Sequence, residues 1–230
     1  MSPTETKEHP SNEPIECNRK IVLEMTEAFA KLVDANDEYT NSHSFRVAYY
    51  TKLLTAELGY DHRTIELYYY AALAHDIGKA SIPKHILMKD GKLTTNEFRI
   101  ISQHTTQGYE VLKGIKSAPE LAQAAYCHHE RPDGEGYPRG LRGDQIPRVA
   151  QIIAVADTFD AMYSDRPYRE RMNFEHVVSI IREGAGTQFF VDVVDAFLRL
   201  VQKGEFRAKD DFGGGCTEDI NNIEAARMRA

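Results

Sequence analysis

Residues 147–160 read PRVAQIIAVADTFD, and this stretch decides the fold class. A proline opens it, which suits the first turn of a helix. Ile152, Val155 and Phe159 then recur at the three- and four-residue spacing of an amphipathic helix. The segment just before it, residues 131–146, holds four glycines and two prolines. A loop of that length inside a compact domain is usually functional, so we expect a functional loop followed by a helix.

The same helical period extends through most of the chain. Thr94 and Glu97 have the spacing of a capping box and predict a helix that runs to about Leu112. Ser117 and Glu120 repeat that spacing. No segment alternates apolar and polar residues over a useful length. We therefore expect an all-α protein, a single compact helical bundle with one long Gly/Pro-rich loop. Further helices are predicted over residues 21–33, 47–58 and 191–201, and after an Asn173 cap.

The two ends of the chain differ from its middle in composition. Residues 1–18 are polar and hold three prolines, which predicts a disordered tail. The stretch 208–230 includes three consecutive glycines and reads as a flexible tail. Residues 19–207 are expected to form one catalytic domain.

Composition excludes several classes of protein. The 28 lysines and arginines are outnumbered by 35 aspartates and glutamates, which argues against binding to a nucleic acid polymer. Three cysteines without a C-x-x-C pair exclude a disulfide scaffold. The longest apolar run, residues 67–74, is far shorter than the roughly 20 residues of a membrane span. We expect a cytoplasmic protein with no membrane partner.

Five of the nine histidines and two aspartates lie on or at the ends of predicted helices. Helical bundles build metal sites from such facing side chains. Burying this set is costly unless cations lie among it, and imidazole with carboxylate suits iron, manganese or zinc. Two divalent cations would also attract a phosphate. From spacing alone, a helical domain with scattered buried histidines remains the alternative. The seven residues are His43, His75, Asp76, His104, His128, His129 and Asp157.

Three motifs resemble those of one known family. They are AALAHDIGKASIP at 71–83, HHERPDGEGYPRGLRGDQIP at 128–147 and AVADTFDAMYSDRPYR at 154–169. They look like the HD-GYP family, a branch of the HD-domain metal-dependent phosphohydrolases, and the resemblance covers about residues 20–205. Members are all-α, hold two or three metals, usually iron or manganese, and hydrolyse the bacterial second messenger cyclic di-GMP. The resemblance implies a signalling phosphodiesterase that yields the linear dinucleotide pGpG or GMP.

Carried over by position, the resemblance implies that all seven residues are metal ligands, with Asp76 as the bridge. Lys79, three and four residues beyond Asp76 and His75 on the same helical face, would approach the scissile phosphate. The alternative is a solvated lysine at a helix end. Members with a third metal carry a glutamate four residues before the first ligand histidine. Tyr39 stands there in this chain, and the neighbouring Glu38 would point about 100° away on a helix. We therefore expect two divalent ions, iron or manganese. His43 would either bind one of them or support a residue that does.

The resemblance also implies residues that bind the substrate. Arg166 and Arg169 look like a phosphate-binding pair, although the second position is often lysine in the family. Guanidinium groups suit phosphate oxygens. Tyr137 would contact the substrate or anchor its own loop. Asp37 would lie near the guanine, and Asp160 would contact the substrate or support the site.

The reaction expected is phosphodiester hydrolysis by a metal-activated hydroxide. Two alternatives stay open. One is a catalytically weak cyclic-dinucleotide sensor or interaction module that docks other signalling proteins through its GYP loop, the segment 131–146 that holds Gly136-Tyr137-Pro138. The other is a hydrolase of a different cyclic dinucleotide, such as mixed cyclic GMP-AMP. Cys127, beside the paired histidines, is expected to be a small buried core residue rather than a redox-active one.

Overall fold

The computed structural model describes residues 24–33, 43–165 and 170–206. Within these ranges the chain is helical and forms no strand, as predicted. Residues 24–33 are helical, and two short 3-10 helices, η1 (Ile77–Ser81) and η2 (Gly143–Gln145), interrupt the longer elements. The remaining helices are α2 (His43–Glu57), α3 (His62–Leu73), α4 (Lys84–Leu87), α5 (Thr95–Leu112), α6 (Pro119–Cys127), α7 (Arg148–Tyr163), α8 (Phe174–Glu183) and α9 (Val191–Gln202).

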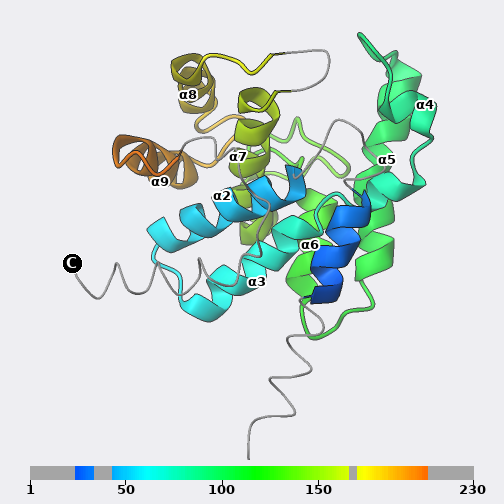
Figure 1. Ribbon diagram of the computed structural model, residues 1–230, viewed down its shortest axis with the longest axis horizontal. Helices are drawn as coiled ribbons and strands as arrows, with labels where there is room; N and C mark the ends of the chain where they lie inside the picture. Colours follow the sequence, from blue (N-terminus) through cyan, green and yellow to red (C-terminus); the bar gives the residue numbers. More distant parts are fainter. Residues whose placement is uncertain (1–23, 34–42, 166–169, 207–230) are drawn as a thin grey trace, which may run out of the picture.

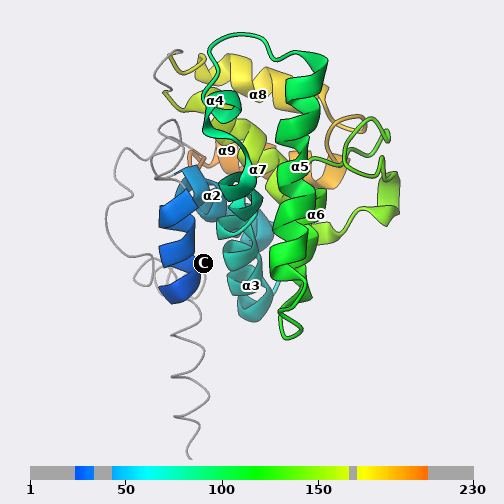
Figure 2. The same cartoon turned by 90° about the vertical axis from the view of Figure 1, so that its right-hand side faces the viewer.

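Helix α7 lies near the centre of the molecule (Figure 1) and packs against α2, α3, α6, α8 and α9. Its central place follows from its sequence, because apolar side chains cover most of its circumference. On one side, Phe159 lies edge-on to Tyr50 and Phe206, with ring centroids 5.0 and 4.7 Å apart. Phe197 from α9 completes this aromatic cluster. Helices α5 and α6 run side by side (Figure 2), on the side of the bundle opposite α8 and α9 in Figure 1.

The predicted helix signals are mostly confirmed. Thr94 and Glu97 form a complete capping box at the start of α5. Asn173 caps α8, since its side chain accepts the N–H of His176 at 3.3 Å. The capping signal at Ser117 is wrong. Helix α6 begins at Pro119, so Ala118 and not Ser117 is at its N-cap, and no side chain caps it.

The predicted tails, residues 1–18 and 208–230, lie outside the described residues, so the division of the chain into tails and a single domain at 19–207 stays a prediction. In the ranges that are described, the helices share one main hydrophobic core. None of those helices has both the length and the hydropathy of a membrane span.

Candidate metal centre

Five separate segments bring the seven predicted metal ligands together. One comes from the first residue of α2, two from the turn after α3, one from the middle of α5, two from the end of α6 and one from α7. Their donor atoms form overlapping groups in which every pair lies within 4.8 Å. These groups are His104 with His128 and His129, His43 with His75 and Asp157, and His75 with Asp76 and His128.

Asp76 lies between the first two groups and faces both. Its Oδ1 is 3.4 Å from His104 Nε2 and 3.7 Å from His128 Nε2. Its Oδ2 is 3.2 Å from His75 Nε2 and 3.7 Å from His43 Nε2. A carboxylate with one oxygen toward each group of imidazoles is placed to bridge two cations.

Three of the imidazoles are oriented by local backbone carbonyls. Each uses Nδ1 to bond a carbonyl three or four residues earlier, so Nδ1 carries the proton and Nε2 presents a lone pair to the interior. Histidines that ligate metals usually donate their other N–H in this way. The pairs are His75 with Ala72 at 2.6 Å, His104 with Ile101 at 2.7 Å, and His128 with Ala124 at 2.9 Å.

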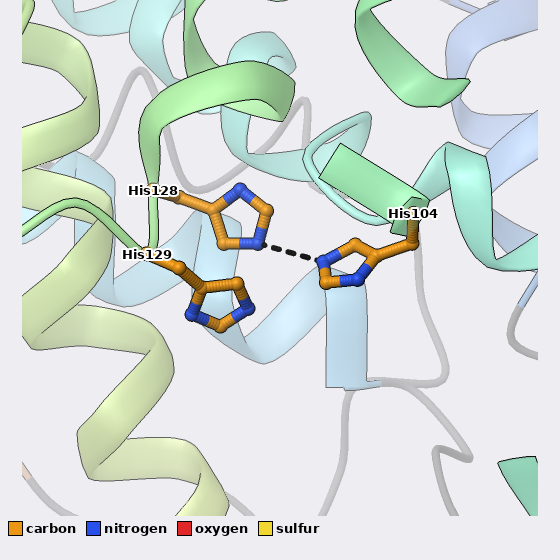
Figure 3. A group of neighbouring side chains, drawn as sticks. All are labelled: His104, His128 and His129. Atoms are coloured by element: carbon orange, nitrogen blue, oxygen red, sulfur yellow. Dashed lines mark hydrogen bonds between the residues drawn. The ribbon is translucent and has the colours of Figure 1, made fainter. Parts of the chain in front are cut away.

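This orientation leaves polar atoms that lack partners. The Nε2 atoms of His104 and His128 point at one another 3.3 Å apart (Figure 3), and two lone pairs at that distance repel. His75 Nε2 and Asp76 Oδ1 are buried without a hydrogen-bond partner. Buried polar atoms are costly when left unsatisfied. A divalent cation is the group that would satisfy these atoms together, so the donor set fits metal ions.

The protonation states of His128 and His129 favour the same role. Burial, reinforced by His129 and His75, holds the pKa of His128 well below its usual value. Burial likewise lowers the pKa of His129 to about 4. Both imidazoles are therefore neutral near pH 7, as metal ligands must be. Although burial opposes ionisation of Asp76, the charges of His75 and Lys79 hold the pKa of that carboxyl well below its usual range.

The pKa values of His43 and His75 are shifted upward instead. Although burial opposes protonation, Asp157, Asp160 and Asp76 raise the pKa of His43. Against the same effect of burial, Asp76 raises the pKa of His75. These two imidazoles would therefore lose a proton on binding a cation.

Lys79 lies in η1 and not on a continuation of α3, which ends at Leu73. Its Nζ is 2.6 Å from Asp76 Oδ2, because residues three apart eclipse in a 3-10 helix. A side chain that is 20% exposed and paired with a buried carboxylate is not simply a solvated lysine at a helix end. Its role at a scissile phosphate stays a prediction.

Gly78 is a residue that the sequence analysis missed. A Cβ at this position would lie 1.9 Å from the carbonyl oxygen of His104 and 2.6 Å from the amide nitrogen of Gly108. Only glycine lets η1 approach α5 so closely, and the approach carries Asp76 toward His104. A glycine between a candidate ligand and a candidate catalytic lysine was the available signal.

Asp160 lies behind His43 and is 2% exposed. Its Oδ2 is 2.7 Å from His43 Nδ1. Arg46, which the sequence analysis missed, donates its Nε to Oδ1 at 2.6 Å, and the hydroxyl of Ser164 donates to Oδ1 at 2.9 Å. Both carboxylate oxygens are therefore used inside the protein. This placement favours support of His43 over contact with substrate.

The GYP loop is attached to the metal centre through His129. The ring of Tyr137 stacks on this imidazole, with ring centroids 4.7 Å apart. The backbone N–H of Tyr137 also donates to the backbone carbonyl of His129. Glu130, also missed, is buried and accepts the backbone N–H groups of Arg139 and Leu141 at 2.7 and 2.9 Å. Tyr137 thus anchors its loop, and its contact with substrate stays a prediction.

Several predicted residues lie outside the described ranges. They are Asp37, Arg166 and Arg169, together with the Tyr39 position on which the two-metal prediction rests. Cys127 is described: it is 3% exposed, and burial raises the pKa of its thiol to about 11. A protonated, buried thiol agrees with the predicted core role.

Residues 27–193 match the HD domain family. Among relatives, a cyclic di-GMP phosphodiesterase of Thermotoga maritima is 41% identical over 182 residues, 78% of this chain and 49% of the relative. A 3'3'-cGAMP-specific phosphodiesterase of Vibrio cholerae is 41% identical over 160 residues, 70% of this chain and 35% of the relative. The chain thus spans about half or less of the length of these relatives.

A solved structure shows the same fold. The crystal structure of a cyclic GMP-AMP specific phosphodiesterase from V. cholerae superposes with a TM-score of 0.60 at 16% identity. The match covers 86% of this chain and 53% of the other. It confirms the all-α architecture.

Proposed function

The chain belongs to the HD domain family, and we propose that it is a metal-dependent phosphodiesterase that hydrolyses cyclic di-GMP. The observation that carries the proposal is the placement of Asp76, which presents one oxygen to each of two groups of histidines. The relatives named for cyclic dinucleotide hydrolysis support the substrate class.

We assign one divalent cation, iron or manganese, to each group of ligands, with Asp76 between them. His104, His128 and His129 would hold one ion, and His43, His75 and Asp157 the other. When bound, such ions polarise phosphoryl oxygens and lower the pKa of a coordinated water. Two ions bring four positive charges against two aspartates, so the centre attracts an anionic diester in a chain whose net charge is -7.

The chain's own residues have separable tasks in this proposal. The backbone carbonyls that bond each Nδ1 fix the imidazoles with their lone pairs inward. Lys79 places its ammonium at the centre, where it would stabilise charge on the phosphate oxygens. Arg166 and Arg169 would hold phosphate, and Asp37 would lie near a guanine. The products would be pGpG or GMP, and the protein would act in the cytoplasm.

A second candidate is hydrolysis of the mixed dinucleotide 3'3'-cGAMP. It is favoured by the V. cholerae relative of that specificity, which is as similar to this chain as the T. maritima enzyme. The metal centre would be the same in both cases. Selectivity between the two dinucleotides would depend on the residues that contact the bases.

The test is turnover by protein purified without oxygen, with bound metal quantified on the same sample. Cyclic di-GMP, 3'3'-cGAMP and bis(p-nitrophenyl) phosphate are compared with iron and with manganese. We expect turnover of cyclic di-GMP with about two metals per chain. Turnover of the nitrophenyl diester alone would refute the substrate, and full metal occupancy without any turnover would favour the sensor alternative.

A further inference from the structure

A cavity of about 270 Å³ adjoins the metal centre. One wall holds His128 and His129, and another holds Tyr137 of the GYP loop. Helix α7 and the turn before α9 close the remaining sides. Pockets for whole drug-sized ligands are usually ≈ 300–1,000 Å³, so this cavity suits one part of a dinucleotide and not the whole molecule.

The cavity lies on the accessible side of the centre. Of the seven assigned ligands, His129 and Asp157 are only partly buried, whereas the other five are buried. His129 lines the cavity itself, and Thr158, which follows Asp157 on α7, lines it as well. A group attached to a phosphate at the metal centre would therefore reach this space first.

Phe98 gives the cavity an open aromatic wall. Its side chain is 50% exposed, so part of the ring is open to a ligand in the cavity. It lies edge-on to Tyr137, with ring centroids 5.6 Å apart at 79°. Tyr137 already stacks on His129, so the exposed ring of Phe98 is the surface on which a flat ligand group would stack.

Two polar side chains that line the cavity are not used in hydrogen bonds within the described residues. The Thr158 hydroxyl and the Gln188 amide make no side-chain hydrogen bond to any residue in the described ranges. Glu130 accepts two backbone amides and Arg131 pairs with Asp133, whereas Glu135 at the exposed rim lies 3.9 Å from Arg131. An amide both donates and accepts, which matches the mixed donor and acceptor edge of a purine.

We infer that this cavity receives one nucleobase of the substrate, with Phe98 stacking on its face and Gln188 and Thr158 hydrogen-bonding its edge. The inference rests on the proposed function for the identity of the substrate. It adds residues that recognise the base, which neither the motifs nor the comparisons assign.

The first experiment measures binding and does not depend on turnover. GMP and ribose 5-phosphate, which carry the same phosphate with and without a base, are titrated into the metal-loaded full chain by calorimetry. The wild type should bind GMP at least about tenfold more tightly, and Phe98→Ala should lose most of that difference. Phe98→Tyr, which keeps a ring, should retain it. Phe29→Ala is the matched control, because Phe29 is also 50% exposed but lies away from the cavity.

The second experiment compares substrates with and without a base. For cyclic di-GMP, Phe98→Ala should raise KM about tenfold with kcat changed less than about twofold. Gln188→Ala should raise KM about three- to tenfold, and Gln123→Ala, at an exposed position on α6, should not. Turnover of bis(p-nitrophenyl) phosphate, whose rings can stack but lack the hydrogen-bonding edge of a purine, should be unchanged in Gln188→Ala and in Gln123→Ala.

The outcomes separate the two proposals. Equal losses by Gln188→Ala on both substrates, or equal preference of Phe98→Ala and the wild type for GMP, would overturn the base cavity. A wild type that fails to hydrolyse cyclic di-GMP refutes the proposed substrate, and the GMP titration then still decides whether the cavity binds a base.

Discussion

Two sides of α7 show two different ways of filling a protein interior. Phe159 points into the aromatic cluster with Tyr50, Phe197 and Phe206, and it is fully buried. Asp157, two residues earlier, points to the metal centre on the other side. Two residues on a helix differ by about 200°, so one short stretch supplies both regions.

The two regions differ in whether their side chains find all of their interaction partners within the protein. Most ring pairs of the aromatic cluster pack edge-to-face and Tyr50 stacks on Phe206, and both arrangements are favourable without any further partner. The metal centre holds facing lone pairs and a buried carboxylate oxygen without a donor. The cluster therefore stabilises the fold by itself, whereas the proposed cations would satisfy the unpaired atoms of the centre. Four substitutions test this contrast.

The largest effect is expected for Asp76→Ala. Removing the shared carboxylate should abolish binding of at least one metal and lower turnover by about 10³-fold or more, since metal ions supply several kcal/mol of transition-state stabilisation. The helical circular dichroism spectrum should be retained. Metal analysis and kinetics on one sample check this, with exposed Asp195→Ala as the control. Full metal content and full turnover would contradict the bridging role.

Phe159→Ala should have the opposite signature. Emptying a fully buried ring position costs about 3–5 kcal/mol of unfolding free energy. Metal binding should fall only as far as the protein unfolds. Urea unfolding measures the loss, and Phe29→Ala, at a half-exposed position, should change stability far less. If Phe159→Ala lost metal while fully folded, the two regions would not be independent.

Asp160→Asn probes the boundary between the two regions. An amide cannot accept from both His43 and Arg46 as the carboxylate does, so His43 loses its fixed orientation. Loss of such a supporting partner usually costs 10- to 100-fold in metal affinity. Titration of metal into the metal-free protein measures this affinity, and Asp195→Asn is the control. Unchanged affinity combined with a higher KM would favour the substrate-binding role first predicted for Asp160.

The smallest effect is expected far from both regions, at the cap of α5. Lys89 and the Thr94 backbone N–H lower the pKa of Glu97 to about 2. A carboxylate with a lowered pKa contributes stability above its usual pKa and loses that contribution as pH falls toward 2. Glu97→Gln should lower Tm by a few degrees at pH 7, and the difference should vanish near pH 2. Glu175→Gln, in the first turn of α8, is the control; an equal effect there would rule out the capping box as the cause.

The sequence alone determined the helical class, the capping box of α5 and the chemical identity of the seven candidate ligands. These features are local, because periodicity, caps and short motifs are set by residues a few positions apart. The same locality explains the error at Ser117. The helix begins at Pro119, so Ala118 is at the N-cap and Ser117 lies one residue too early. It also explains why Lys79 was placed correctly beside Asp76 although the α-helix ends earlier.

The tertiary structure decided which of these groups meet. His43 and Asp160 are 117 positions apart, yet their side chains lie 2.7 Å from one another. Neither the Gly78 contact with α5 nor the cavity beside Phe98 is visible in the order of residues, because each depends on how helices pack. Packing brings together segments whose distance along the chain is large, and only the folded chain fixes those distances.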